Sequence, residues 1–122
     1  MITMVIPETR HLHFGLCEGR HEIKTNEGNT LDAYIFSQVD EPLDFIGHFH
    51  TAKDFFQQKG HGQSPHEIVH LYITGLTSLL TATLLAAEKA QVQCLILMHY
   101  DRESGKLSSA RHNSFALNRE KA

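Results

Sequence analysis

The chain has 122 residues, a formal net charge of −3 with neutral histidines, and a hydrophobic fraction of 41%. This length predicts a single domain with one core, and the charge excludes the basic footprint of a protein that binds long nucleic acids. No stretch reaches the apolar length of a membrane span, and no basic region precedes a long apolar run at the N-terminus, so we expect no signal peptide. The only two cysteines, Cys17 and Cys94, favour a reducing, cytoplasmic setting over a disulfide scaffold.

The first third of the chain gives an uneven secondary-structure signal. A short apolar run at 2–6, ended by Pro7, predicts a first strand. The segment 11–22 mixes glycines, histidines and charges, and it predicts no clear element. Residues 31–39 are rich in β-forming side chains and predict a strand.

A helix is predicted to follow. Asp40 and Pro42 provide a start, with proline tolerated in the first turn, and the helix is expected to run to about Gln58. Its apolar stripe, spaced at helical intervals, consists of Phe45, Phe49, Ala52 and Phe56.

The second half of the chain has clearer patterns. After a loop at 59–65, the β-branched and aromatic residues of 68–74 predict a strand, and 76–90 predict an amphipathic helix. The apolar run 92–98 predicts a strand covered on both faces, and 106–110 are expected to return as an antiparallel strand. The stripe of the second helix consists of Leu76, Leu79, Leu80, Thr83, Leu84 and Ala87.

The resulting order of strand, strand, helix, strand, helix, strand, strand predicts an α/β fold. We expect a small Rossmann-like open sheet, mostly parallel with a C-terminal hairpin, and helices packed on it. The connection between Val69 and Met98 should be a right-handed parallel crossover.

Polar residues follow the strand at 68–74. In an open α/β sheet, ligands bind outside the carboxyl ends of the strands, and a helix N-terminus favours phosphate. The candidate ligand-binding residues at this turn are Thr74, Gly75, Leu76, Thr77 and Ser78. The alternative is that the glycine only makes a turn and that a hydroxyl caps the helix.

A second polar group ends the strand at 92–98. It consists of His99, Tyr100, Asp101 and Arg102. Arginine binds phosphate in a bidentate manner, and histidine can move a proton near neutral pH. The alternative is a solvated hairpin in which Asp101 and Arg102 are turn residues.

A third group, with Arg20 and His21 beside Gly19, is a candidate for a second phosphate-handling element. A plain surface loop explains it nearly as well.

The segment from His66 to His70, HEIVH, matches the zinc-protease pattern H-E-x-x-H and supports a competing hypothesis. That pattern requires a helix, which brings both histidines to one face. The β-branched residues that follow favour a strand, in which side chains four residues apart lie about 13 Å from each other. No third ligand is marked in the sequence.

Ten histidines are the main compositional anomaly. Their protonation near pH 6 would reverse the sign of the net charge, although polar loop positions explain any single histidine equally well. His48 and His50 lie about 200° apart around the predicted helix and cannot share a metal there. His11 and His13 could share one if their segment is extended.

The segments LYITGLTSLLTATLLAA and LILMHYDRESGKL together resemble the C-terminal half of small CRISPR-associated Rossmann-like proteins. The resemblance is to ring nucleases, which degrade cyclic oligoadenylate messengers. It covers residues 69–107 and consists of a strand, a Thr-Gly-Leu-Thr turn, a helix, a strand, His-Tyr-Asp-Arg and a hairpin. The histidine-rich segment 59–66 has no counterpart in the pattern.

This resemblance implies a cytoplasmic homodimer that binds a two-fold symmetric cyclic oligoadenylate across its interface. A ribose 2′-hydroxyl attacks the adjacent phosphate and leaves a 2′,3′-cyclic phosphate, with no metal or other cofactor. The enzyme aligns the hydroxyl, stabilises the phosphate charge and moves protons.

The roles expected on this hypothesis follow the three polar groups. Residues 74–78 would hold a phosphate, Arg102 and Arg20 would neutralise it, and His99 or His21 would transfer protons. Asp101 completes the predicted catalytic set and Tyr100 the ligand-binding set. The alternatives are a non-catalytic cyclic-nucleotide sensor and a zinc hydrolase that uses His66 and His70.

The predicted dimer contact lies on the second helix. Leu85, Ala82 and Ala86 fall outside its main stripe, so they are candidates for packing against a second copy across a two-fold axis. The alternative is that they are covered within one chain.

Overall fold

The computed structural model describes residues 8–18, 23–73, 77–100 and 107–112, with the backbone alone for Tyr100 and 107–112. The described elements are β1 (Arg10–Cys17), β2 (Ala33–Phe36), α1 (Phe45–Gln58), β3 (Glu67–Ile73), α2 (Thr77–Lys89), β4 (Leu95–Tyr100) and β5 (Leu107–His112).

The strands form one sheet in the order β2-β1-β3-β4-β5. The first four strands in this order are parallel, and β5 pairs antiparallel with β4. This is the small, mostly parallel α/β sheet with a C-terminal hairpin that the sequence predicts. The parallel connection from β3 through α2 to β4 is also confirmed.

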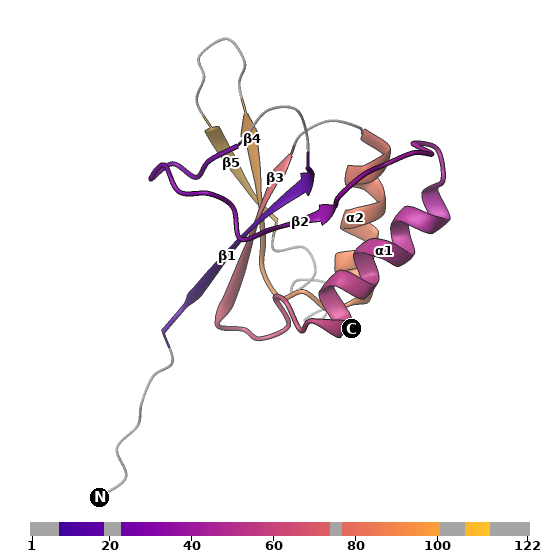
Figure 1. The fold of residues 1–122 in the computed structure, drawn as a ribbon. Coiled ribbons are helices and arrows are strands. Elements are labelled where there is room, and N and C mark those ends of the chain that lie inside the picture. The colour runs from indigo at the N-terminus through magenta and orange to yellow at the C-terminus, as the bar shows by residue number, and fades with distance from the viewer. Residues whose placement is uncertain (1–7, 19–22, 74–76, 101–106, 113–122) are drawn as a thin grey trace, which may run out of the picture.

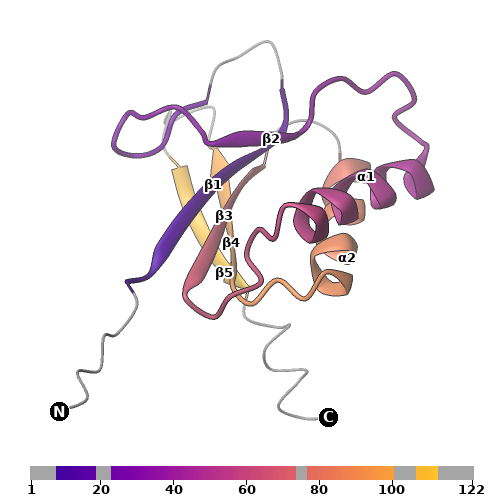
Figure 2. The same ribbon diagram turned by 60° about the horizontal axis from the view of Figure 1, so that its bottom comes forward.

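Both helices lie on the same side of the sheet, as Figures 1 and 2 show from two directions. The connections β2-α1-β3 and β3-α2-β4 cross the sheet in the same direction, and connections of one hand then place their helices on one face. The connection from β1 to β2 runs the opposite way. Its described part, 23–32, contains an isolated bridge between Lys24 and Thr30 and no helix.

The core lies between the helices and one face of the sheet. Alternate residues of the central strands point toward the helices, as the two-residue period of a strand requires. On the strand side the buried residues include Leu12, Phe14, Leu16, Val69, Leu71, Leu95 and Leu97. On the helix side they include Ala52, Phe56, Leu79, Ala86 and Ala87.

The segment 11–22, which gives no clear prediction, contains most of β1. Within its sequence RHLHFGLC, the side chains from His11 to Phe14 alternate between non-core and core positions. The histidines at the alternate positions face away from the helices, and they make the apolar half of the pattern hard to recognise. The strand predicted at 2–6 lies outside the described residues.

Helix α1 begins at Phe45, so the predicted start at Asp40 and Pro42 is wrong. Asp44 is the N-cap, because its Oδ1 accepts a hydrogen bond from the backbone N–H of Gly47 at 3.1 Å.

The buried stripe of α1 also differs from the prediction: it consists of His48, Ala52, Phe55 and Phe56, and Phe45 is 38% exposed. His48 occupies the inward position because its Nε2 hydrogen-bonds the carbonyl of Glu41 at 2.8 Å. Its ring also meets that of Phe36 edge-on.

The predicted dimer contact on α2 is largely internal. Ala82 and Ala86 are completely buried within this one chain, where α2 packs against α1. Their small side chains allow the two helices to approach. Leu85 is 43% exposed and remains available for another contact.

On the sheet face away from the helices, Tyr34 of β2 lies over Gly15 of β1, its register partner. A Cβ atom at position 15 would overlap with the Tyr34 ring and come within 3.0 Å of Leu31. Glycine is therefore required here for the close approach of the ring.

We expect Gly15→Ala to lower the free energy of unfolding by about 1–3 kcal/mol, as overpacking does in tight sites. The measurement is urea denaturation of four proteins: the wild type, Gly15→Ala, Tyr34→Ala and the double variant. The loss of unfolding free energy caused by Gly15→Ala should be smaller when Tyr34 is also alanine. An equal cost in both backgrounds would show that the ring is not the obstacle.

Candidate functional site

The carboxyl ends of β1, β3 and β4 lie side by side at one edge of the sheet. Gly15 pairs with Tyr72, and Ile73 pairs with His99. In the sequence, two of the predicted polar groups come after β1 and β3, whereas the third begins inside β4, whose last two residues are His99 and Tyr100. The predicted residues that lie outside the described part of the chain are Arg20, His21, Thr74, Gly75, Leu76, Asp101 and Arg102.

His99 is the described member of the predicted catalytic set. It is the next-to-last residue of β4, and its side chain is exposed. Its neighbours across the ladder are Ile73 of β3 and Ser108 of β5. Tyr100, which follows it, is described by its backbone alone.

Thr77 and Ser78 lie in the first turn of α2, and Thr77 is the fourth residue after the end of β3 at Ile73. The hydroxyl of Ser78 donates a hydrogen bond to the carbonyl of Pro42 at 2.9 Å, which ties α2 to the loop before α1. Thr77 is exposed, so of these two hydroxyls it is the better placed for a ligand.

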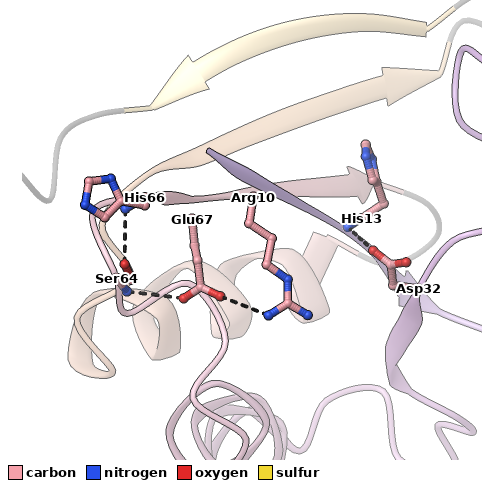
Figure 3. A network of polar contacts seen from close by, with 6 residues as sticks. All are labelled: Arg10, His13, Asp32, Ser64, His66 and Glu67. Atoms are coloured by element: carbon pink, nitrogen blue, oxygen red, sulfur yellow. Dashed lines mark hydrogen bonds and ion pairs between the residues drawn. The ribbon is translucent and has the colours of Figure 1, made fainter. Parts of the chain in front are cut away.

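The zinc-protease interpretation of HEIVH is wrong, because β3 begins at Glu67 and the segment is a strand. The Glu67 carboxylate serves a structural purpose: it lies 3.9 Å from the Arg10 guanidinium and accepts a hydrogen bond from the backbone N–H of Ser64 (Figure 3). The backbone N–H of His66 in turn donates to the Ser64 hydroxyl. Glu67 therefore has a structural role, because its contacts stabilise the start of β3.

A second polar cluster, which we call the histidine cluster, consists of His11 and His13 of β1 with His70 and Tyr72 of β3. Nδ1 of His11 lies 2.9 Å from Nε2 of His70, and Nδ1 of His13 lies 2.8 Å from the Tyr72 hydroxyl. His13 and His70 are register partners, and their rings stack with centroids 4.6 Å apart. The cluster lies on the sheet face opposite the helices, because Leu12, Val69 and Leu71 of the same strands point the other way.

Burial shifts the pKa values of the two β3 residues of the histidine cluster, His70 and Tyr72. Desolvation, with smaller contributions from His13 and His11, lowers the pKa of His70 to about 4. Desolvation also raises the pKa of Tyr72, with help from the carboxylates of Glu27 and Asp32. Both groups are therefore neutral at physiological pH.

The backbone beside the cluster is also fixed. Asp32 accepts a hydrogen bond from the N–H of His13 at 2.8 Å (Figure 3), and the Asp32 N–H donates to the His13 carbonyl. Nδ1 of His70 is buried and has no hydrogen-bond partner among the described residues.

Sequence reasoning named His11 and His13 as a possible pair but missed the contribution of β3. The feature that brings the two strands' histidines together is the parallel register of β1 and β3, which places His13 beside His70. Within the described ranges, no three His, Cys, Asp or Glu side chains are grouped so as to hold a metal ion. None of the helices described is long and apolar enough to cross a membrane.

Comparisons with protein families, with characterised proteins and with solved structures give no match to this chain. The case for a function therefore depends on the residues and geometry of the chain itself.

We expect stability to fall as the pH drops from about 6.5 toward 4. In the unfolded chain His70 binds a proton near pH 6.5, whereas in the folded chain its pKa is about 4, so the unfolded state takes up more protons in this window. We estimate a loss of about 1–2 kcal/mol, less than the full shift would give, because the ring is partly exposed to solvent.

The measurement is urea denaturation at pH 7 and pH 4.5 for the wild type, His70→Gln and His50→Gln, a control at an exposed position of α1. The acid-induced loss should be smaller in His70→Gln and unchanged in His50→Gln. The same loss in all three proteins would assign it to other groups.

Proposed function

We propose that the protein is a metal-independent phosphodiesterase that binds and cleaves cyclic oligoadenylates at the carboxyl edge of β1, β3 and β4. The observation that supports this is the sheet order, in which these three strand ends are neighbours. The order reverses beside β1, since β2 lies on one side of it and β3 on the other, and such a switch point is where open α/β sheets bind ligands.

The described residues offer two of the functions that this reaction needs. The N-terminus of α2, with the exposed Thr77 in its first turn, is suited to a phosphate through its unpaired N–H groups and its partial positive charge. His99 is exposed at the end of the adjacent strand, where an imidazole can accept the proton of a ribose 2′-hydroxyl.

The chemistry proposed is an in-line attack of that 2′-hydroxyl oxygen on the adjacent phosphorus. A new P–O bond forms, the bond to the 5′-oxygen breaks, and the imidazolium returns the proton to the leaving 5′-oxygen. The products are a 2′,3′-cyclic phosphate and a free 5′-hydroxyl. Arg102, Arg20 and His21, which the sequence assigns to the same edge, would provide charge neutralisation and a second proton-transfer group.

We expect His99→Ala to lower the rate of cleavage by about 100-fold or more, because a general acid–base group is lost. The assay follows cyclic tri-, tetra- and hexa-adenylate in excess EDTA by chromatography. Binding of the ligand should be largely retained, and the fold should be unaffected because the side chain is exposed. His50→Ala, at an exposed position of α1, is the matched control.

Three outcomes of this assay are informative. Cleavage in EDTA that depends on His99 supports the phosphodiesterase. Binding without turnover in the wild type supports a nucleotide sensor that uses the same edge. The absence of both binding and cleavage contradicts the proposal.

We further propose that the active form is a cytoplasmic homodimer that shares one cyclic ligand. The exposed apolar side chains that support a contact between copies are Leu43, Phe45 and Ile46, with Leu85 on α2. Leu43 is 90% exposed and Ile46 69%. Leu43 directly follows Pro42, the residue that contacts the first turn of α2, so a dimer contact there would adjoin the ligand edge.

We expect sedimentation at micromolar concentration to show a dimer, and the double variant Leu43→Ser with Ile46→Ser to shift it to a monomer. These side chains lose apolar area only if a partner covers them, so the free energy of unfolding of the monomer should change little. Lys53→Ser, on the same helix, is the control. A monomeric wild type with and without ligand would contradict the shared-ligand arrangement.

A further inference from the structure

We propose that His11 and His70 bind a divalent transition-metal ion, such as Zn²⁺, on the helix-free face of the sheet. This site is separate from the carboxyl edge and does not depend on the phosphodiesterase activity proposed above. It uses two imidazoles from neighbouring strands, one exposed and one half-buried.

The two ligand atoms already converge. Nδ1 of His11 and Nε2 of His70 are 2.9 Å apart, whereas two imidazole nitrogens on a tetrahedral Zn²⁺ are separated by about 3.3 Å. Opening the pair by a few tenths of an ångström and turning the His11 ring lets an ion bind to one side of the line that joins the two nitrogens, about 2.0 Å from each. The exposed His11 ring can make this movement without disturbing the core.

The protonation state suits a metal. An imidazole binds a metal ion through a nitrogen that carries no proton, and the 2.9 Å contact between the two facing nitrogens requires one of them to be unprotonated. In the metal-free pair one proton is shared between the two facing nitrogens. Binding moves that proton to the other nitrogen of the same ring, so each ring keeps one proton and the pair releases none.

The neighbouring groups limit the site to two protein ligands. His13 stacks on His70, and its Nδ1 is held by the Tyr72 hydroxyl. Glu67 alternates with His70 along β3 and points to the same side as Val69 and Leu71, so its carboxylate lies on the helix side of the sheet, where it pairs with Arg10. Water therefore fills the remaining coordination positions.

The ion class follows from the ligands. Two imidazoles suit Zn²⁺, Cu²⁺, Ni²⁺ and Co²⁺, whereas Mg²⁺ and Ca²⁺ prefer oxygen ligands. With two protein ligands and exchangeable water, we expect an affinity in the micromolar range, which is characteristic of a labile site.

The test is a calorimetric titration of the full chain with ZnCl₂ at pH 7.5, after treatment with EDTA and its removal. We expect one ion per chain at this site, and His11→Ala should weaken its binding by about tenfold or more because one of two protein ligands is lost. His50→Ala and His66→Ala are controls at exposed histidines, and they should leave this affinity unchanged. A titration with MgCl₂ should show no binding.

A second measurement identifies the nitrogens without any substitution in the half-buried strand. Long-range ¹H–¹⁵N spectra of the histidine rings should show Zn²⁺ shifting Nδ1 of His11 and Nε2 of His70 toward the metal-bound range. Nδ1 of His13 should keep its hydrogen-bonded position. The proposal would be overturned if Zn²⁺ changed the ¹⁵N chemical shifts of other histidines only, or if His11→Ala and the control variants lost the same affinity for Zn²⁺. In either case His11 and His70 would be a hydrogen-bonded pair only.

Discussion

The direction in which the chain crosses its own sheet is the constraint on which the rest of the structure depends. From β2 to β3 and from β3 to β4 the crossovers run the same way, so both helices cover one face and the core forms there. The step from β1 to β2 runs the other way, and its described part supplies a turn and a bridge instead of a helix. The sheet face opposite the helices therefore carries polar side chains of β1 and β3, which a helix packed on that face would not allow.

The sequence predicts the second half of the fold well because local pattern and tertiary environment agree there. β3 and α2 both contribute to the core, and the apolar residues of β3 follow the expected period. On α2 the buried face is shifted from the predicted stripe, because Ala82 and Ala86 are fully buried whereas Leu80 and Leu84 are partly buried. β1 shows where this fails: its second face holds histidines instead of simple polar residues, so the alternation of HLHF does not look like a half-buried strand. The start of α1 fails for another reason, because Pro42 is a common first-turn residue but the cap is made by Asp44.

The two polar regions differ in how far the sequence alone predicts them. Polar residues that follow an apolar run mark the carboxyl edge locally, so His99 and Thr77 can be assigned to it from the pattern alone. The histidine cluster joins residues 59 positions apart, and only the register of β1 against β3 brings His13 beside His70. A motif within one segment cannot contain that information. HEIVH shows the opposite error: the zinc-protease motif is visible within one segment, but that segment forms strand β3, and the motif requires a helix.

Burial also limits how many of the ten histidines become protonated near pH 6. The sequence predicts a reversal of net charge near pH 6 if many histidines become protonated, but the environment of each ring decides this. Desolvation lowers the pKa of His70 to about 4 and lowers that of His61, which lies against Phe14 and Phe55. These two rings take up a proton less readily than an exposed histidine does, because a charge there would lose its hydration. The neutral His70 ring can therefore stack on His13 of β1 without repulsion between two charged rings.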